Sequence, residues 1–266
     1  MNKTKISITI DKDVLSHIDS IIDNVYIRNR SQAIEYLAKI SLGENKTAVI
    51  LAGGPIERQK ISETEFRPTY LVGSRSVSER AVQKLVQSGF KKIFIIARHE
   101  VLTAFFSQLK DGSTLGATIQ YVEEKESNGS FSSLKCLRGK INSRFLVVYS
   151  DIIFESINLK ALWETHLKIS SFCTLMLTTS EQPIEKGSVM MEGTKITDFN
   201  QKTDSRNNLV FSPIFICETD VLDLPGSSLE LDLFPALASR GLLDGYITSA
   251  KETHIHSVSD ADNFKD

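Results

Sequence analysis

The chain has 266 residues, enough for two domains, and 41% of them are apolar, as expected of a protein with a buried core. A formal net charge of −2 excludes a protein that attracts nucleic acid over its whole surface, so any contact with DNA requires a local patch. No apolar run reaches the roughly 20 residues that a membrane span needs, and the N-terminus lacks the apolar core of a signal peptide. We therefore expect a cytoplasmic protein without a membrane partner.

The cysteines argue for the same compartment. Cys136, Cys173 and Cys217 are far apart in the sequence and form no Cys-x-x-Cys pair. Scattered cysteines in odd number are typical of reduced, buried thiols in the cytosol. A reactive thiol would need a partner that the sequence does not show.

The N-terminal segment shows a strand followed by two helices. Polar and apolar residues alternate strictly over 5–10, which predicts a strand with one buried face. Asp11 can cap a helix whose apolar residues recur at helical spacing over 14–22. Ser31 is the predicted N-cap of a second helix, with its apolar side over 33–40. We place the domains at residues 1–45 and 46–266.

This strand cannot complete its hydrogen bonds alone. Two short helices also bury three strand isoleucines poorly, so the segment favours a second copy that pairs with it. Dimerisation would then be part of folding.

The Lys-Ile-Ser-Ile-Thr-Ile strand and the Ile-Arg-Asn-Arg-Ser-Gln-Ala-Ile start of the second helix resemble the ribbon-helix-helix family of the Arc and MetJ type. The resemblance implies a homodimer whose two-stranded ribbon enters the major groove of double-stranded DNA. The expected base-reading side chains are those of Lys5, Ser7 and Thr9. Phosphate contacts are expected at the start of the second helix, from Asn29, Arg30 and Ser31. A module that only dimerises remains the alternative.

From residue 47 onward, buried strands alternate with helices, which favours an α/β unit with a mostly parallel sheet covered on both faces. Strands are expected at 47–51, 92–97, 118–122, 145–149, 174–178, 188–191, 213–217 and 245–248, and helices at 78–88, 101–109, 132–137 and 231–239.

Four segments of this part, at 48–58, 66–71, 145–151 and 196–202, resemble the sugar-phosphate nucleotidyltransferase family. The resemblance implies a Rossmann-like, three-layer α/β/α fold. It implies nucleotide binding by the turn after the first strand, with Arg58 on the phosphates. In an active enzyme Arg58 and Asp151 would be catalytic, Asp151 would bind Mg²⁺, and Gln201 and Lys202 would reach the sugar. The implied nucleotide-binding residues are Leu51, Ala52, Gly53, Gly54 and Arg58.

Several residues depart from that family's pattern. Ile56 stands where the family has glycine and would crowd a triphosphate, and Glu57 adds a negative charge. Thr69 stands where the family has a phosphate-neutralising lysine. Ser150 and Gln201 replace a glycine and a glutamate. Because losing one charge-stabilising donor costs about 10²–10³ in rate, we expect impaired catalysis.

Near the C-terminus, where the family has a second metal-binding aspartate, the chain reads His254-Ile255-His256. The two histidines alternate and therefore share one strand face. They could bind a metal, but the sequence identifies no third ligand.

Together these patterns favour a dimeric, sequence-specific DNA-binding transcriptional regulator whose second domain senses a nucleotide or sugar nucleotide. The alternative is an active, Mg²⁺-dependent sugar-phosphate nucleotidyltransferase that dimerises through its N-terminal module, with Arg58 and a lysine such as Lys60 replacing the missing charge. An antitoxin-like binder is disfavoured, because a large folded domain follows the N-terminal module.

Overall fold

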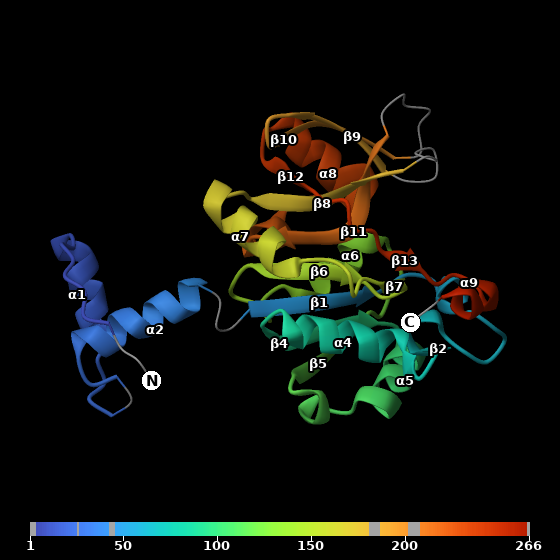
Figure 1. Cartoon of the computed structure of the whole chain (residues 1–266), viewed down its shortest axis with the longest axis horizontal. Helices are drawn as coiled ribbons and strands as arrows, with labels where there is room; N and C mark the ends of the chain where they lie inside the picture. Colours follow the sequence, from blue (N-terminus) through green and yellow to red (C-terminus); the bar gives the residue numbers. More distant parts are fainter. Residues whose placement is uncertain (1–3, 26, 43–45, 181–186, 202–207, 265–266) are drawn as a thin grey trace. The chain divides into compact units, whose positions relative to one another are not determined.

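The computed structural model describes residues 4–25, 27–42, 46–180, 187–201 and 208–264 (Figure 1). The chain divides into two compact units, Met1–Asn45 and Lys46–Asp266. Among the described residues, no helix combines the length and the hydropathy that crossing a bilayer requires.

The first unit contains two helices, α1 (Lys12–Ser20) and α2 (Arg30–Leu42). Asp11 caps α1 as expected, because its Oδ1 accepts a hydrogen bond from the Asp13 N–H at 2.8 Å. The strand expected at 5–10 does not form in the single chain, where described residues 4–10 have no regular secondary structure. The physical reason is that this segment pairs with no strand among the described residues.

The start of α2 also differs from expectation. Helix α2 begins at Arg30, so that Ser31 lies inside the first turn and does not cap it. The cap is Asn29, whose Oδ1 accepts a hydrogen bond from the Gln32 N–H at 3.0 Å. The Asn29 side chain, one of the predicted phosphate contacts, is therefore occupied.

The second unit is built on a nine-stranded sheet with the order β5-β4-β1-β6-β11-β8-β12-β10-β9. Its strands are β1 (Lys46–Ala52), β4 (Phe90–Ala97), β5 (Thr118–Glu123), β6 (Phe145–Tyr149), β8 (Cys173–Thr179), β9 (Gly187–Glu192), β10 (Lys195–Gln201), β11 (Leu209–Cys217) and β12 (Leu243–Ile247). Two further strand pairs are β2 (Leu71–Val72) with β3 (Arg75–Ser76), and β7 (Ile152–Ile153) with β13 (Thr253–His254).

The sheet is mixed, and the expectation of a mostly parallel sheet is wrong. Strands β5, β4, β1 and β6 are parallel, but β11 runs antiparallel to both β6 and β8, and β10 runs antiparallel to β12 and β9. Sequence pattern could not show this, because β11 is buried on both faces and, apart from Ser212 and Pro213, is as apolar as a buried parallel strand.

Helices cover both faces of this sheet and make three layers. Alternate residues of β1 enter two separate cores: Val49 lies with α6 and α8 side chains, while Ile50 lies with those of α4, α5 and α7. These helices are α4 (Val77–Gln87), α5 (His99–Leu109), α6 (Ser130–Leu134), α7 (Leu159–Ile169) and α8 (Phe234–Ser239). The remaining helical segments are α3 (Ile56–Gln59), α9 (Val258–Asn263), a π-helical turn (Leu229–Leu233) and 3₁₀ turns at Arg67–Thr69, Ser113–Leu115, Lys135–Leu137 and Thr219–Asp223.

Candidate functional site

The sheet has a topological switch point between β1 and β6. From β1 the chain adds β4 and then β5 on one side, and it returns to add β6 on the other. In open α/β sheets, ligands bind beyond the carboxyl ends of the strands at such a point. The Ser150 N–H donates to the Leu51 carbonyl at 3.1 Å, so the turn after β1 and Asp151 after β6 lie next to each other.

The glycine turn after β1 packs tightly against α6. A Cβ atom on Gly53 would lie 2.3 Å from the Ser133 Oγ, and Gly54 has a φ of 107°. The Gly54 N–H donates at 2.7 Å to Glu124, a buried carboxylate that also accepts from the Ser133 hydroxyl. Packing therefore requires glycine at position 53, the positive φ favours it at position 54, and the Gly54 amide is bound to Glu124. No sequence motif points to Glu124.

Arg67 places positive charge at this site. Its Nη1 lies 3.8 Å from the Asp151 Oδ2, and its Nε donates to the Lys60 carbonyl at 3.2 Å. Although Thr69 stands where the family has a lysine, the chain carries a cation two residues earlier that lies beside Asp151. The Thr69 hydroxyl donates within its own turn, to the Phe66 carbonyl.

In α3, the charged residues Glu57 and Arg58 are both exposed to solvent. Glu57 is 80% exposed and forms an ion pair with Lys60 at 3.3 Å. Arg58 is exposed to solvent beside the glycine turn. Lys60 is thus engaged by Glu57, and Arg67 is the cation nearer to Asp151.

A cavity of about 200 Å³ contains two of the predicted site residues, Asp151 and Gln201. It is lined by Tyr149, Asp151, Gly187, Gln201, Phe211, Pro213, Glu230, His254 and His256. The Tyr149 hydroxyl donates to Glu230, a contact across the cavity wall that the sequence did not reveal. Lys202, the other predicted sugar contact, lies outside the described residues.

Gln201 offers an unused acceptor in this cavity. Its Oε1 is buried and has no hydrogen-bond partner among the described residues. A Cβ atom on Gly187 would lie 3.0 Å from that oxygen and 2.6 Å from the Phe199 ring, so glycine is needed there. A buried acceptor without a partner is costly unless a ligand supplies the donor.

Asp151, His254 and His256 form a cluster in the same cavity, with one ligand atom of each within 4.8 Å of the others. The structure thus places Asp151 beside the two histidines as a third candidate ligand, which the sequence alone did not identify. Burial acts to raise the pKa of Asp151, but the hydrogen bond from His256 and the charges of both imidazoles outweigh it and lower that pKa. Mg²⁺ prefers six oxygen ligands, and one carboxylate with two imidazoles suits it poorly as a resident ion.

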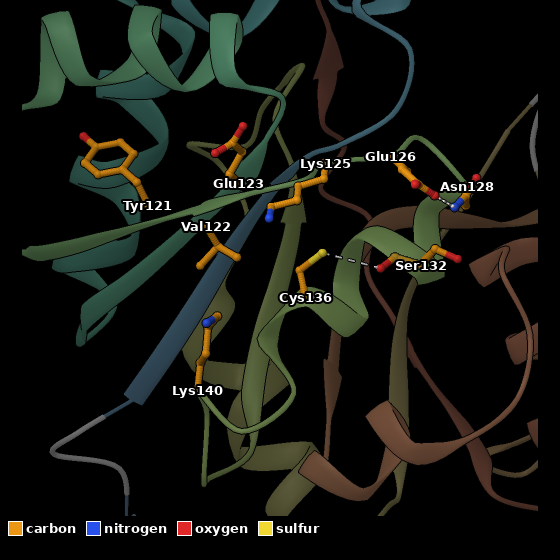
Figure 2. A pocket seen from close by; sticks show the side chains of 9 residues that line it. All are labelled: Tyr121, Val122, Glu123, Lys125, Glu126, Asn128, Ser132, Cys136 and Lys140. Atoms are coloured by element: carbon orange, nitrogen blue, oxygen red, sulfur yellow. Dashed lines mark hydrogen bonds between the residues drawn. The ribbon is translucent and has the colours of Figure 1, made fainter.

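A larger hollow of about 610 Å³ lies elsewhere, between β5 and α6, and contains none of the predicted site residues (Figure 2). Cys136 faces it, and the Lys125 and Lys140 side chains come from its two sides. Burial, followed by the nearby Glu124 charge, raises the pKa of the Cys136 thiol. A raised thiol pKa disfavours the nucleophilic thiolate. We assign the site to the smaller cavity because it contains the predicted site residues Asp151 and Gln201.

The other two cysteines are buried free thiols. The fold brings together Cys173 and Cys217, which are distant in sequence, on paired strands with 3.1 Å between their sulfurs. Burial raises the pKa of Cys217 well above its ordinary value, in keeping with the expected inert thiols.

In the first unit, Lys5, Ser7, Thr9 and Ser31 are exposed, but two of the three predicted phosphate contacts, Asn29 and Arg30, are engaged within the unit. Arg30 forms two hydrogen bonds with Asp19, at 2.7 and 2.8 Å, and holds the pKa of that carboxyl below its ordinary value. Asn29 is occupied as the helix cap.

Known proteins that are similar to this chain in sequence and in structure are named as sugar-phosphate nucleotidyltransferases. The chain is 23% identical over 76% of its length to a mannose-1-phosphate guanylyltransferase of Mycobacterium tuberculosis, and 27% identical over 72% to a mannose-1-phosphate guanyltransferase of Yarrowia lipolytica. It spans 59% and 55% of those two proteins, little more than half of each. A structure from Bacillus anthracis, described as a candidate glucose-1-phosphate thymidylyltransferase in complex with a sucrose, superposes with a TM-score of 0.73 at 19% identity. That alignment covers 83% of this chain and 96% of the other.

The family model described as Nucleotidyl transferase matches residues 47–238. The matched range contains the glycine turn, Arg67, Asp151 and Gln201. Because it covers well over half of the chain, the protein belongs to the nucleotidyl transferase family.

Proposed function

We propose that the second unit transfers a nucleotidyl group from a nucleoside triphosphate to a sugar 1-phosphate. An oxygen of the sugar phosphate bonds to the α-phosphorus, the bond from that phosphorus to the bridging oxygen breaks, and pyrophosphate leaves with the electron pair. The names of the relatives support the reaction class. The observation that carries the proposal for this chain is the Arg67 guanidinium beside Asp151 at the switch point of the sheet.

Arg67 would stabilise the negative charge that develops on the phosphates. Its guanidinium is held by the Lys60 carbonyl, so it is oriented before a ligand arrives. Arg58 is exposed beside the glycine turn and would add a second cation. In this proposal Arg67 and Arg58 would supply the positive charge that the family's lysine provides and that Thr69 lacks.

Gln201 would position the sugar. Its buried Oε1 can accept a hydrogen bond from a sugar hydroxyl, which would satisfy an oxygen that has no partner among the described residues. Tyr149 and Glu230 line the same cavity and offer further polar atoms, while Phe211 provides an apolar wall.

The test is pyrophosphate release by the full chain from each common nucleoside triphosphate, with mannose 1-phosphate or glucose 1-phosphate and with Mg²⁺, Mn²⁺ or Zn²⁺. We expect Arg67→Ala to lower kcat/KM by about 10²–10³. Gln201→Ala should raise the KM for the sugar phosphate more than that for the triphosphate. Arg240→Ala, at the exposed end of α8, is the control and should have no effect.

If no combination releases pyrophosphate, the transferase proposal is wrong. Calorimetric titration with nucleotides then distinguishes a sugar-nucleotide sensor from a cavity that binds no nucleotide. Binding of one sugar nucleotide without turnover would support a sensor, and no binding of any nucleotide would leave the cavity without a nucleotide function.

We further propose that the first unit pairs with a copy of itself and binds double-stranded DNA as part of a transcriptional regulator. The supporting observation is that Ile6 and Ile8 are 71% and 52% exposed in the single chain, on a segment that alternates as a strand does. Pairing with a second copy would bury these isoleucines. It would leave Lys5, Ser7 and Thr9 on the opposite face, toward DNA.

Two measurements test this second proposal. Sedimentation velocity should show a dimer, and the protein should bind one duplex sequence with an affinity that falls as salt rises. Lys5→Ala combined with Thr9→Ala should abolish that binding, while Lys91→Ala in the second unit should not. A dimer that binds no duplex at low salt would identify the first unit as a dimerisation module only.

A further inference from the structure

The cluster of Asp151, His254 and His256 is built by backbone pairing. Strand β13 pairs antiparallel with β7, with His254 opposite Ile152, and the Ile255 N–H donates to the Asp151 carbonyl at 2.8 Å (Figure 1). The Ile255 side chain is fully buried in a small core. Because side chains alternate along an extended segment, the two histidines flank Ile255 on the other face, next to the Asp151 carboxylate.

The buried carboxylate of Glu252 lies next to the imidazole ring of His254. The Oε1 of Glu252 lies 3.2 Å from the His254 Nε2, and its Oε2 accepts from the Ser212 hydroxyl at 2.6 Å. The Glu252 side chain is 0% exposed, so its position is fixed by packing. Metal-binding histidines usually hold a carboxylate with the ring nitrogen that does not bind the metal, which fixes the ring's tautomer and orientation. In His254 the Nδ1 would then be the nitrogen for a metal.

We propose that Asp151, His254 and His256 bind a divalent transition metal of the Zn²⁺ type in preference to Mg²⁺. Two imidazoles and one carboxylate are donors that suit Zn²⁺ and its neighbours, whereas Mg²⁺ favours an all-oxygen set. Three protein ligands are also the number that ligand-binding zinc sites use, which leaves coordination positions for oxygen atoms of a bound molecule. Tyr149 and Gln201 line the same cavity, so a phosphate or sugar oxygen could reach the ion.

The competing explanation is a simple ion pair. The His256 Nε2 lies 3.2 Å from the Asp151 Oδ2, and Arg67 lies 3.8 Å from the same oxygen. Ion pairs account for each imidazole singly, since the His254 Nε2 also lies 3.2 Å from the Glu252 Oε1, but they do not require both histidines to converge on Asp151, where one ligand atom of each residue lies within 4.8 Å of the others. The inference goes beyond the proposed function, since the ion would bind whether or not the cavity turns over a sugar phosphate.

Metal titration of the full chain, freed of metal by chelation, tests this inference. We expect one Zn²⁺ per chain by equilibrium dialysis, bound roughly 100-fold or more tightly than Mg²⁺. Co²⁺ should bind at the same site and give a visible absorption band. His254→Ala and His256→Ala should each weaken Zn²⁺ binding by at least roughly 100-fold, and Glu252→Gln, which acts through His254, by roughly 10-fold.

The control is His99→Ala. The His99 Nδ1 lies 4.0 Å from a Glu123 carboxylate oxygen, so it is a histidine–carboxylate pair outside this cluster, and its loss should leave Zn²⁺ binding unchanged. Fluorescence of the single tryptophan, Trp163, checks that each variant is folded. Zn²⁺ binding that survives both histidine substitutions, or Mg²⁺ binding as tight as that of Zn²⁺, would overturn the inference. So would the absence of Zn²⁺ and Co²⁺ binding, which would leave an ion-paired network only.

Discussion

The two units of the chain differ in how far their isoleucine side chains are exposed to solvent. In the second unit, β1 lies inside a sheet with helices on both faces, and Ile50 is 1% exposed. In the first unit, Ile6 and Ile8 are 71% and 52% exposed on a segment that pairs with no strand among the described residues. The second unit therefore completes its core within one chain, whereas the first presents apolar side chains that a partner could cover.

The largest expected effect tests this difference directly. Ile50→Ala should lower the free energy of unfolding of the second unit by about 2–5 kcal/mol, because it leaves a cavity in a closed core. Ile8→Ala should leave that transition unchanged and weaken self-association. Trp163 lies in α7, so its fluorescence in urea reports the second unit, and sedimentation velocity reports association. Equal shifts of the fluorescence midpoint in both variants would contradict the comparison.

A second contrast concerns two arginine–carboxylate pairs. Arg80 is 1% exposed, and its Nη1 bonds Glu155 at 2.9 Å, while its Nη2 bonds the Val72 carbonyl. Glu155→Ala should cost about 2 kcal/mol, because a buried guanidinium loses a charge-assisted hydrogen bond, and Glu155→Gln should cost less. Asp19→Ala, which breaks the exposed pair with Arg30, should change stability little, and less still in high salt.

Urea unfolding of the Glu155 variants by Trp163 fluorescence, and of Asp19→Ala by circular dichroism at two salt concentrations, measures the contrast. The contrast between the two pairs is refuted if Glu155→Ala lowers the free energy of unfolding no more than Asp19→Ala does.

The smallest expected effect is an acid sensitivity of the second unit. The hydrogen bond from His166, 3.4 Å away, lowers the pKa of Glu218 below its ordinary 4.5, with a further contribution from Arg144. A lowered folded-state pKa stabilises the fold above the unfolded pKa, and that contribution is lost as the pH falls from about 4.5 through the folded value.

Glu218→Gln should therefore be less stable than the wild type at pH 7, with the difference shrinking below pH 4.5. Urea midpoints from pH 7 to pH 3 measure it. The contribution is small because water partly screens the carboxylate. A difference that is constant across this range would refute the assignment.

The sequence predicted the parallel half of the sheet well because β1, β4 and β6 are apolar runs with turn signals at their ends. It failed at β10, where a register shift between Ile196 and Asp198 breaks the period of two on which strand prediction depends. Helix α7 was missed although its signals are present, since Asn158 caps it and its apolar residues repeat at helical spacing.

At the site, resemblance to the family located Asp151 and Gln201, and the structure places both in one cavity. Arg67, Glu124 and Glu230 could not be found in the same way. Their roles depend on contacts between distant segments, and a single sequence contains no record of those contacts. The histidine pair was noticed, but its third ligand became visible only through the pairing of β13 with β7.

That pairing also has a kinetic consequence. It joins segments about a hundred residues apart, and such contacts form late in folding because closing a long loop costs entropy before the contact compensates for it. We expect the Asp151–His254 contact to be among the last to form and a metal ion bound there to hold the C-terminal segment against the sheet. A chain whose sheet is incomplete would then bind no ion, so that metal occupancy reports a fully folded second unit.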